Sequence, residues 1–472
     1  MKTTWLGGIL AVVALSLGPA ATLEAHGGDP TKIHACVNNN SGEVKIVAPS
    51  ATCNTNSTAT DWNVTGPQGP QGPAGSGGAA RTLPMDFTVD CNAGQTIQGT
   101  LEQGLIPGDQ LLVTGTCHEN VVIPQEINRL VLNGQGTTVL APPDLTGPAI
   151  TVRGRGIGIQ NFTISGGLQG ISVFGGGTAT IDSNVVQNAG QHGIALTRAA
   201  TATIVNNTIQ NNSVHGISIF SSSSAAIGFR SAQDAVASPN LIVNNGQIGI
   251  NIGQSSDASI DGNTISGNGS FGINVAEASA ARIGFSGITG SFTAANAITN
   301  NGRNGIRVAG SSNVGIEGNT IAHNGGAGIS VDFSSSVDIG FRGFSNNIQT
   351  STGAGIEVLH SSSARIIGAV ISTTGGDGVR VIRASQADVG STTINASVAG
   401  VRVEENSGVN LGSGNTGNSG NFAVSCRTGS YISGTLGGLT GGLGQKDFAI
   451  VGTSVELGVP INSEDCIDRV GP

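Results

Sequence analysis

The stretch Asn240-Leu-Ile-Val-Asn-Asn-Gly-Gln-Ile-Gly249-Ile-Asn-Ile-Gly-Gln-Ser-Ser-Asp-Ala-Ser-Ile260 decides the fold, because the chain repeats its pattern many times. The shared element is a glycine followed by Ile or Val, any residue, and a further aliphatic residue. The intervals between these marker glycines, by subtraction, are 23, 23, 33, 23, 33, 23, 27, 23 and 22 residues. A period of this length is typical of a solenoid, in which each repeat forms one coil. The marker glycines are Gly170, Gly193, Gly216, Gly249, Gly272, Gly305, Gly328, Gly355, Gly378 and Gly400.

Aliphatic residues keep step with the marker glycine. One row stands eleven positions after it, from Ile181 to Leu411, and another stands seven positions before it, from Val186 to Ile371. Alternation within Gly-Ile-x-Val places the two aliphatic residues on one face of a strand and the middle residue on the other. Since one coil cannot bury its apolar face alone, stacking of coils must bury it.

Asparagine forms two further rows, nine and four positions before the marker glycine. Asn tolerates left-handed turn geometry, and stacked amides can hydrogen-bond from coil to coil. We therefore interpret both rows as structural; the alternative is a row of amides that binds sugars. The rows are Asn184, Asn207, Asn240, Asn263, Asn296, Asn319 and Asn346, and Asn212, Asn245, Asn268, Asn301 and Asn324.

The composition agrees with many short strands joined by tight turns. The 472 residues include 76 Gly, only 10% charged residues and 3% aromatic residues. This predicts an all-β fold rather than a helical or α/β domain. The net charge of −9 and the absence of a basic run make nucleic acid and anionic membranes unfavourable partners.

The chain order predicts four parts. Residues 1–25 read as a signal peptide, with Lys2 before an apolar run and cleavage after Ala21 or Ala25. Residues 26–65 form a small cysteine-containing module, 66–80 a collagen-like and Gly-rich linker, and 81–472 the solenoid. Within the solenoid we expect an N-terminal cap at 81–110, coils at 111–425 and a C-terminal cap at 426–472. A secreted or surface-associated protein follows, without a membrane span in the mature chain.

The linker begins with three triplets, Gly66-Pro-Gln-Gly-Pro-Gln-Gly-Pro-Ala-Gly75. Gly at every third position with Pro after it is specific for the polyproline-II habit of collagen. Three triplets are few for a stable triple helix, so we interpret the stretch as a stiff spacer; a trimer assembled through it is the alternative. The layout of module and linker resembles the N-terminal segments of some bacterial secreted proteins with collagen-like repeats, and this resemblance implies no activity.

The six cysteines lie in three sequence-local couples, and none falls in the repeats. In an exported chain they predict disulfides, and the hypothesis is local pairing among the 15 possible connectivities. Without a CxxC motif or clustered histidines, a metal site is the weaker interpretation. The expected pairs are Cys36–Cys53, Cys91–Cys117 and Cys426–Cys466.

The entry to the solenoid carries its own signals. Residues 96–105 can form an amphipathic helix with Ile97, Leu101 and Leu105 on one face, and Pro107-Gly-Asp109 ends it. A first strand at 110–117 follows, then Cys117-His-Glu-Asn120. This region resembles the entry to right-handed parallel β-helix proteins of the pectin-lyase-like superfamily. The resemblance implies a single-stranded parallel β-helix with a capping helix and a disulfide-closed C-terminal cap.

Members of that superfamily often act on acidic polysaccharides by lyase, hydrolase or epimerase chemistry. Their polygalacturonase and epimerase motifs are absent from this chain. Three outward charges on neighbouring repeats remain as catalytic candidates, with Asp332 and Glu357 as base or ligand and Arg380 as a clamp. The alternative is a cross-strand ion pair on a solvated face. No cofactor is expected, except Ca²⁺ if the protein is a lyase; His192 and His215, one repeat apart, are weak evidence for a metal.

Three longer repeats carry their extra residues just after an Ile-Gly-Phe motif, which predicts three loops on one edge. Insertions on one face of a solenoid often form its binding face; the alternative is that the phenylalanines only pack the loop bases. The candidate binding residues are Phe229, Arg230, Phe285, Phe341 and Arg342, together with Arg307 on the strand face.

The leading hypothesis is a secreted binding or structural module that engages a polysaccharide or cell-envelope glycan. The competing hypothesis is a polysaccharide lyase, hydrolase or epimerase with its site near Asp332, Glu357 and Arg380. The sequence does not name the ligand.

Overall fold

The computed structural model describes residues 29–63, 81–230, 237–284, 295–350, 352–373, 375–448 and 466–471. The chain divides into two compact units, Met1–Ala80 and Arg81–Pro472. The predicted signal peptide, the collagen-like linker and Phe285 lie outside the described residues. In the described ranges, no helix has the length and hydrophobicity needed to cross a membrane.

The first unit contains a three-stranded antiparallel sheet, in the order β2-β1-β3, formed by β1 (Lys32–Asn38), β2 (Val44–Val47) and β3 (Ser57–Asn63). The disulfide Cys36–Cys53 joins the central strand β1 to the connection between β2 and β3. So few residues cannot bury a large core, and the covalent link limits the entropy of the unfolded chain.

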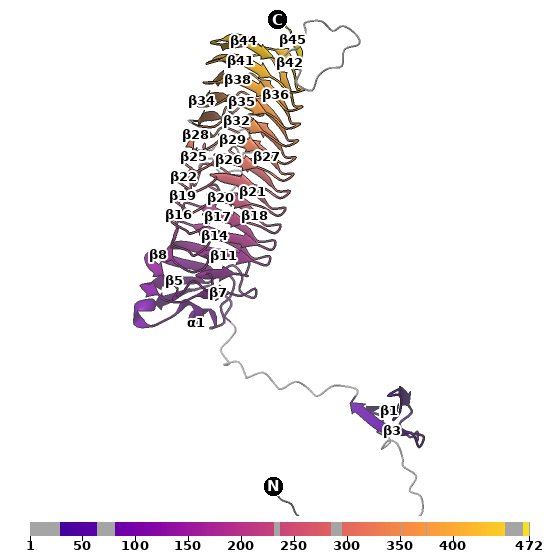
Figure 1. Ribbon diagram of the computed structural model, residues 1–472. Coiled ribbons are helices and arrows are strands. Elements are labelled where there is room, and N and C mark those ends of the chain that lie inside the picture. Colours follow the sequence, from indigo (N-terminus) through magenta and orange to yellow (C-terminus); the bar gives the residue numbers. More distant parts are fainter. Residues whose placement is uncertain are drawn as a thin grey trace, which may run out of the picture. The chain divides into compact units, whose positions relative to one another are not determined.

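The second unit is a stack of parallel coils (Figure 1). One strand of each coil joins a 14-stranded sheet, here called the long sheet. Its register aligns the repeats, so that Ile250 pairs with Ile273, and Ile273 with Ile306. The strands are β7 (Val121–Ile123), β9 (Ile150–Val152), β11 (Ile171–Phe174), β14 (Ile194–Thr197), β17 (Ile217–Ile219), β20 (Ile250–Ile252), β23 (Ile273–Val275), β26 (Ile306–Val308), β29 (Ile329–Val331), β32 (Ile356–Val358), β35 (Val379–Val381), β38 (Ala399–Val403), β41 (Phe422–Cys426) and β44 (Gly444–Phe448).

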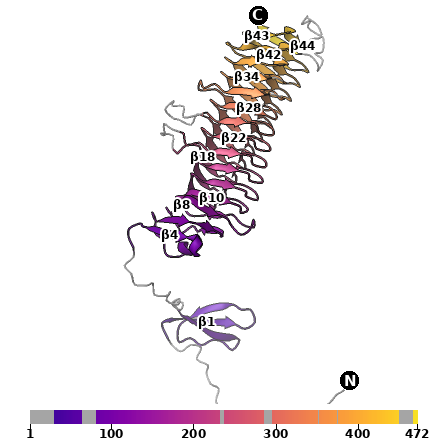
Figure 2. The ribbon, with the colours of Figure 1, turned by 90° about the vertical axis from the view of Figure 1, so that its left-hand side faces the viewer.

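Two further ladders complete the coils, and Figure 2 shows the stack after a turn of 90°. One comprises β12 (Thr178–Asp182), β15 (Thr201–Val205), β18 (Ser224–Ile227), β21 (Asp257–Ile260), β24 (Ala280–Ile283), β27 (Asn313–Ile316), β30 (Ser336–Ile339), β33 (Ser363–Ile367), β36 (Gln386–Gly390), β39 (Gly408–Leu411), β42 (Tyr431–Thr435) and β45 (Ile467–Gly471). The other comprises β13 (Val185–Gln187), β16 (Thr208–Gln210), β19 (Leu241–Val243), β22 (Thr264–Ser266), β25 (Ala297–Thr299), β28 (Thr320–Asn324), β31 (Asn347–Thr350), β34 (Val370–Thr373), β37 (Thr393–Asn395), β40 (Thr416–Ser419) and β43 (Gly438–Gly441).

The aliphatic rows point inward. Each coil contributes side chains such as Ile250, Ile252, Ile260 and Ile265, all with 0% exposure, to one continuous core. The marker glycine is required because the coils approach closely there: a Cβ on Gly249 would lie 2.6 Å from the carbonyl oxygen of the next marker glycine. Stacking therefore explains most of the repeat.

Both asparagine rows are buried hydrogen-bond ladders. The Nδ2 of Asn240 donates to the Oδ1 of Asn263 at 2.9 Å, and the Nδ2 of Asn245 donates to the Oδ1 of Asn268 at 2.9 Å. With exposures of 0–2%, these amides satisfy backbone groups at the turns and leave no surface for a sugar. The structural interpretation of both rows is therefore correct.

A third polar ladder consists of serines, which the sequence analysis did not single out. The hydroxyl of Ser279 accepts from the backbone N–H of Ser256 at 3.2 Å, and the same bond recurs from coil to coil. These serines follow residues with positive φ, such as Gln254 and Ser255. The ladder satisfies the backbone where the chain leaves the long sheet.

The N-terminal end differs from the prediction in two ways. The expected helix over 96–105 is a single turn, α1 (Ile97–Leu101), after a 3-10 turn η1 (Cys91–Ala93). Parallel pairing begins earlier than residue 110, because β4 (Asp86–Asp90) pairs with β5 (Gln110–Thr114). The remaining strands here are β6 (Thr116–Cys117), β8 (Val131–Leu140) and β10 (Ile157–Ser165).

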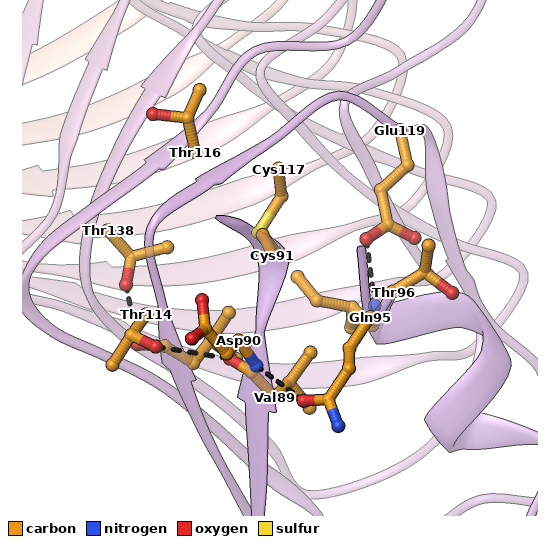
Figure 3. The surroundings of a disulfide bond; sticks show 12 residues. Val89, Asp90, Cys91, Gln95, Thr96, Thr114, Thr116, Cys117, Glu119 and Thr138 are labelled. Atoms are coloured by element: carbon orange, nitrogen blue, oxygen red, sulfur yellow. Dashed lines mark hydrogen bonds between the residues drawn. A yellow bond between two sulfur atoms is a disulfide. The ribbon is translucent and has the colours of Figure 1, made fainter. Parts of the chain in front are cut away.

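The disulfide Cys91–Cys117 fastens this end (Figure 3). Glu119 stands close by, and its two carboxylate oxygens accept from the backbone N–H groups of Ile97 and Gln98 at 2.7 and 2.9 Å. A carboxylate at the first turn of a helix satisfies N–H groups that have no partner within the helix. At the other end, the disulfide Cys426–Cys466 joins β41 to the residue before β45.

Candidate functional site

The outer face of the long sheet carries the side chains that stacking does not explain. Outward positions lie one residue before, two after and four after each marker glycine, and they form three columns along the stack. Neighbouring strands lie about 4.8 Å apart, so each column presents one side chain per coil at that interval. Two regions of this face differ in chemistry: a groove over β9 to β20, and a charged patch over β26 to β38.

The groove has a volume of about 620 Å³. It contains rings and short polar side chains, and Arg153 is the one residue with a permanent charge among those that line it. Such a mixture of aromatic surface and convergent polar groups is typical of ligand sites. The residues that line it include Arg153, Phe174, His192, His215, Phe220 and Gln254.

His192 and His215 lie on adjacent coils with their rings stacked, 4.9 Å between centroids and 8° between planes. Burial lowers the pKa of His192, and burial together with the neighbouring His192 lowers the pKa of His215 to about 4. Both imidazoles are therefore neutral at pH 7. The Nδ1 of His215 accepts from the backbone N–H of Ile248 at 3.3 Å, so its proton is on Nε2. The Nδ1 of His192 is buried and finds no hydrogen-bond partner within the described part of the chain.

Two phenylalanines frame the histidine pair. The guanidinium groups of Arg153 and Arg198 lie 5.5 and 4.7 Å from the ring centroid of Phe174. The ring of Phe220 lies against Gly253 of the next coil, where a Cβ would come within 2.7 Å of it. The absence of a side chain on Gly253 therefore leaves room for the Phe220 ring.

The charged patch contains the three catalytic candidates. Its acidic and basic side chains form ion pairs with one another. The Nη1 of Arg380 lies 3.4 Å from Glu357, and an Nη of Arg307 lies 3.9 Å from Asp332. Arg402 bridges Asp377 at 2.7 Å and Glu404 at 3.1 Å. Ion pairs thus connect neighbouring strands, as the cross-strand interpretation of Glu357 and Arg380 predicts.

Burial raises the pKa of the Glu357 carboxyl above its ordinary value. The Arg380 guanidinium opposes this effect, whereas the charges of Asp377 and Asp332 reinforce it. The Nε of Arg380 is buried and has no hydrogen-bond partner among the described residues. The Nε of Arg380 has consequently lost contact with water without gaining a hydrogen bond in its place.

Asp332 also contacts His360, which the sequence analysis did not select. The Nδ1 of His360 donates to the Asp332 carboxylate, and its Nε2 lies 2.7 Å from the Nη1 of Arg383. Phe333 stacks on the imidazole with 4.9 Å between centroids. Phe333 and His360 both have positive φ, an uncommon backbone conformation for large side chains.

The predicted loop residues divide between structural and exposed positions. Phe229 is 7% exposed, and its role in binding stays a prediction. Arg230 forms an ion pair with Asp182 at 2.6 Å, and Arg342 lies 4.0 Å from Glu317. Phe341 is 53% exposed, with the Arg365 guanidinium 4.5 Å from its ring centroid. Arg307 is on the strand face and donates to Asn274 at 3.1 Å.

The fit of a metal can be tested on the described residues. Their one group of three potential ligands is Cys91, Cys117 and Glu119, but the two sulfurs are bonded to each other and Glu119 accepts from helix N–H groups. In the charged patch, each carboxylate faces a cation rather than converging on a common point. Neither arrangement fits the oxygen-rich shell that Ca²⁺ requires.

The family described as right-handed β-helix region matches residues 148–295 and again 283–436. The chain belongs to the right-handed β-helix family. Both the groove and the charged patch lie within the matched residues of this β-helix protein. No curated protein matches the chain.

Three solved structures show a low similarity to the chain. The A-module of mannuronan C-5 epimerase AlgE6 from Azotobacter vinelandii is 14% identical over 79% of this chain and 92% of its own, with a TM-score of 0.43. PfbA, a surface adhesin of Streptococcus pneumoniae, is 13% identical over 74% and 92%, with a TM-score of 0.32. Pectate lyase Pel9A is 13% identical over 72% and 78%, with a TM-score of 0.29. At these identities the likeness concerns the fold alone.

Proposed function

We propose that this β-helix protein is an extracellular glycan-binding protein and that the groove is its binding site. The observation that carries the proposal is the combination of the His192 and His215 imidazoles, the Phe174 and Phe220 rings and hydroxyl and amide groups in one groove. Sugars present apolar C–H faces to rings and hydroxyl groups to polar side chains, and this lining supplies both kinds of contact. The three disulfides suit an oxidising, extracellular location.

The repeat itself supports a chain-like ligand. Polar side chains recur at one per coil, so a polymer of similar units can make equivalent contacts on successive coils. Gln169 is one of these polar residues of the groove, and its Nε2 donates to Oε1 of Gln191 on the next coil at 2.8 Å.

The test begins with a glycan array of neutral and uronate-containing sugars, followed by titration of the best ligand. Phe220→Ala removes a ring from the groove and should weaken binding at least about tenfold. Arg380→Gln, in the charged patch, is the matched control and should leave affinity unchanged. Equal weakening by both variants, or by the control alone, would reject the groove as the site.

The second candidate function is a polysaccharide lyase, hydrolase or epimerase at the charged patch. It is favoured by the Asp332–His360 contact, since a carboxylate that orients an imidazole is a common arrangement for a general base. New reducing ends and ultraviolet absorbance should be followed with uronate-containing and neutral polysaccharides, with and without calcium. Turnover that Glu357→Gln abolishes would replace the binding proposal with this one.

A further inference from the structure

The three-stranded sheet of the first unit has two unlike faces. Cross-strand partners point to the same side of a sheet, and the register pairs Ile33 with Trp62, Ala35 with Ile46 and Val37 with Val44. These apolar residues therefore share one face, here called the apolar face. The alternate residues, among them His34, Cys36 and Asp61, share the opposite face.

The opposite face is covered within the unit. The disulfide Cys36–Cys53 ties the connection between β2 and β3 to it, and the imidazole of His34 is 2% exposed. Both ring nitrogens of His34 have partners, Asp61 at 2.9 Å and the carbonyl of Asp29 at 2.6 Å. This side of the sheet is consequently the folded core of the module.

On the apolar face Ala35 is buried beneath its neighbours, but four larger side chains are exposed. Ile33, Val44, Ile46 and Trp62 are 38%, 52%, 72% and 45% exposed, and they are four of the thirteen large hydrophobic side chains that the described residues expose. They lie within one short segment, whereas the other nine are spread over the whole solenoid. A contiguous apolar patch of this kind marks an interaction site more often than isolated exposed side chains do.

We propose that the apolar face is a self-association surface, and that its occupant is the same face of further copies of this chain. The argument for copies, rather than another partner, comes from the sequence that follows the sheet. Gly66, Gly69, Gly72 and Gly75 stand at every third position with Pro67, Pro70 and Pro73 after three of them, and this is the triplet pattern of the collagen triple helix, in which three chains associate.

Neither the apolar face nor the collagen-like triplets are sufficient alone to hold copies of the chain together. An apolar patch on the order of a few hundred Å² is smaller than the about 800 Å² per partner that a stable interface buries. Three triplets are likewise too few to hold a triple helix alone. Adjacent in one chain, each raises the effective concentration for the other, so the assembly predicted is a trimer. This proposal does not rest on the proposed function of the groove.

The experiment is sedimentation velocity of the full mature chain from about 1 to about 100 μM, a range that brackets the affinity of a small interface. Wild-type protein should form trimers as its concentration rises. Ile46→Lys and Val44→Lys place a charge on the apolar face. Each should raise the protein concentration at which half of the chains are associated at least about tenfold. Leu145→Lys, at a 52% exposed position of the solenoid, is the matched control and should leave association unchanged.

Two further measurements separate the contributions. Deletion of residues 66–75 should weaken the assembly and remove its preference for three chains. Trp62 is the single tryptophan after the predicted signal peptide, so its fluorescence should shift to shorter wavelength as copies bury the apolar face. The proposal is wrong if the wild type remains monomeric, if Ile46→Lys and Val44→Lys associate like the wild type, or if Leu145→Lys disrupts association equally. Mass analysis of the Cys36–Cys53 disulfide in each variant confirms that the module has folded.

Discussion

The groove and the charged patch occupy the same face of the same sheet, on strands with the same register. They differ in whether their polar groups can contact a ligand. In the groove, His192 and His215 are neutral and polar groups line the space around them. In the patch, Asp332, Glu357 and Arg380 are already engaged by opposite charges. The comparison teaches that the inward residues determine the coil, whereas the outward residues alone decide whether a coil can accept a ligand.

Burial disfavours the charged form in both regions, but only the patch has counter-charges on neighbouring strands. It keeps the histidines of the groove uncharged, whereas the patch retains its charges because neighbouring strands supply counter-charges. A ligand of the groove displaces water, but a ligand of the patch must displace ion pairs. The following predictions test this difference, beginning with the largest effect.

Acid should loosen the groove strands. Because the pKa of His215 is about 4 in the folded chain and about 6.5 when unfolded, the unfolded state binds more protons between these values, and stability falls as pH falls. The loss of stability should reach at most about 3 kcal/mol below pH 4.

The pH dependence that Glu357 contributes has the opposite sign, because its raised pKa makes its contribution to stability grow as pH falls. Amide exchange of β14 and β17 compared with β32, at pH 7 and pH 4.5, measures both; unchanged exchange in β14 and β17 would contradict the burial argument.

Arg402 should be the most important residue of the patch for stability. Arg402→Met leaves Asp377 and Glu404, whose side chains are 10% and 23% exposed, without their shared cation, at a cost of about 2 kcal/mol. Arg383→Met is the matched control, because Arg383 and Glu405 are half-exposed and their pair should contribute less than about 0.5 kcal/mol. Amide hydrogen exchange of β38, measured in denaturant, distinguishes the effects of Arg402→Met and Arg383→Met. Equal effects would mean that burial does not govern these ion pairs.

The Glu357–Arg380 pair should give the smallest effect. A double-mutant cycle with Glu357→Gln and Arg380→Gln should show a coupling of about 0.5–1 kcal/mol, typical of a partly exposed pair on adjacent strands. The coupling should decrease in high salt. A coupling of several kcal/mol, insensitive to salt, would indicate a buried functional pair and would favour the enzymatic alternative.

The fold could be predicted from the sequence because stacking repeats its requirements in every coil. The marker glycines, the inward isoleucines and the asparagine ladders each recur at a fixed offset, and each has a local physical cause. The end of the solenoid was harder, since it has no repeat: α1 stops at Leu101 instead of continuing to Leu105. A single amphipathic stretch does not establish where tertiary contacts end a helix.

The site was only partly predictable. The sequence placed Glu357 beside Arg380 and His192 beside His215, because one coil separates each pair. It did not reveal the groove, because Phe174 and Phe220 belong to the column four residues after the glycine and lie two coils apart. A column-by-column comparison of outward residues would have found them. Asp332 and His360 stand four and five residues after adjacent marker glycines, at a positive-φ turn that recurs along the stack, so the same comparison would also have brought them together.

The most direct measurement of the central claim is an NMR titration of the histidine imidazoles with the bound oligosaccharide. His192 and His215 report on the groove, and His360 reports on the charged patch. The account predicts that the resonances of His192 and His215 shift with saturation while that of His360 stays unchanged. A shift of His360, with His192 and His215 unaffected, would contradict it.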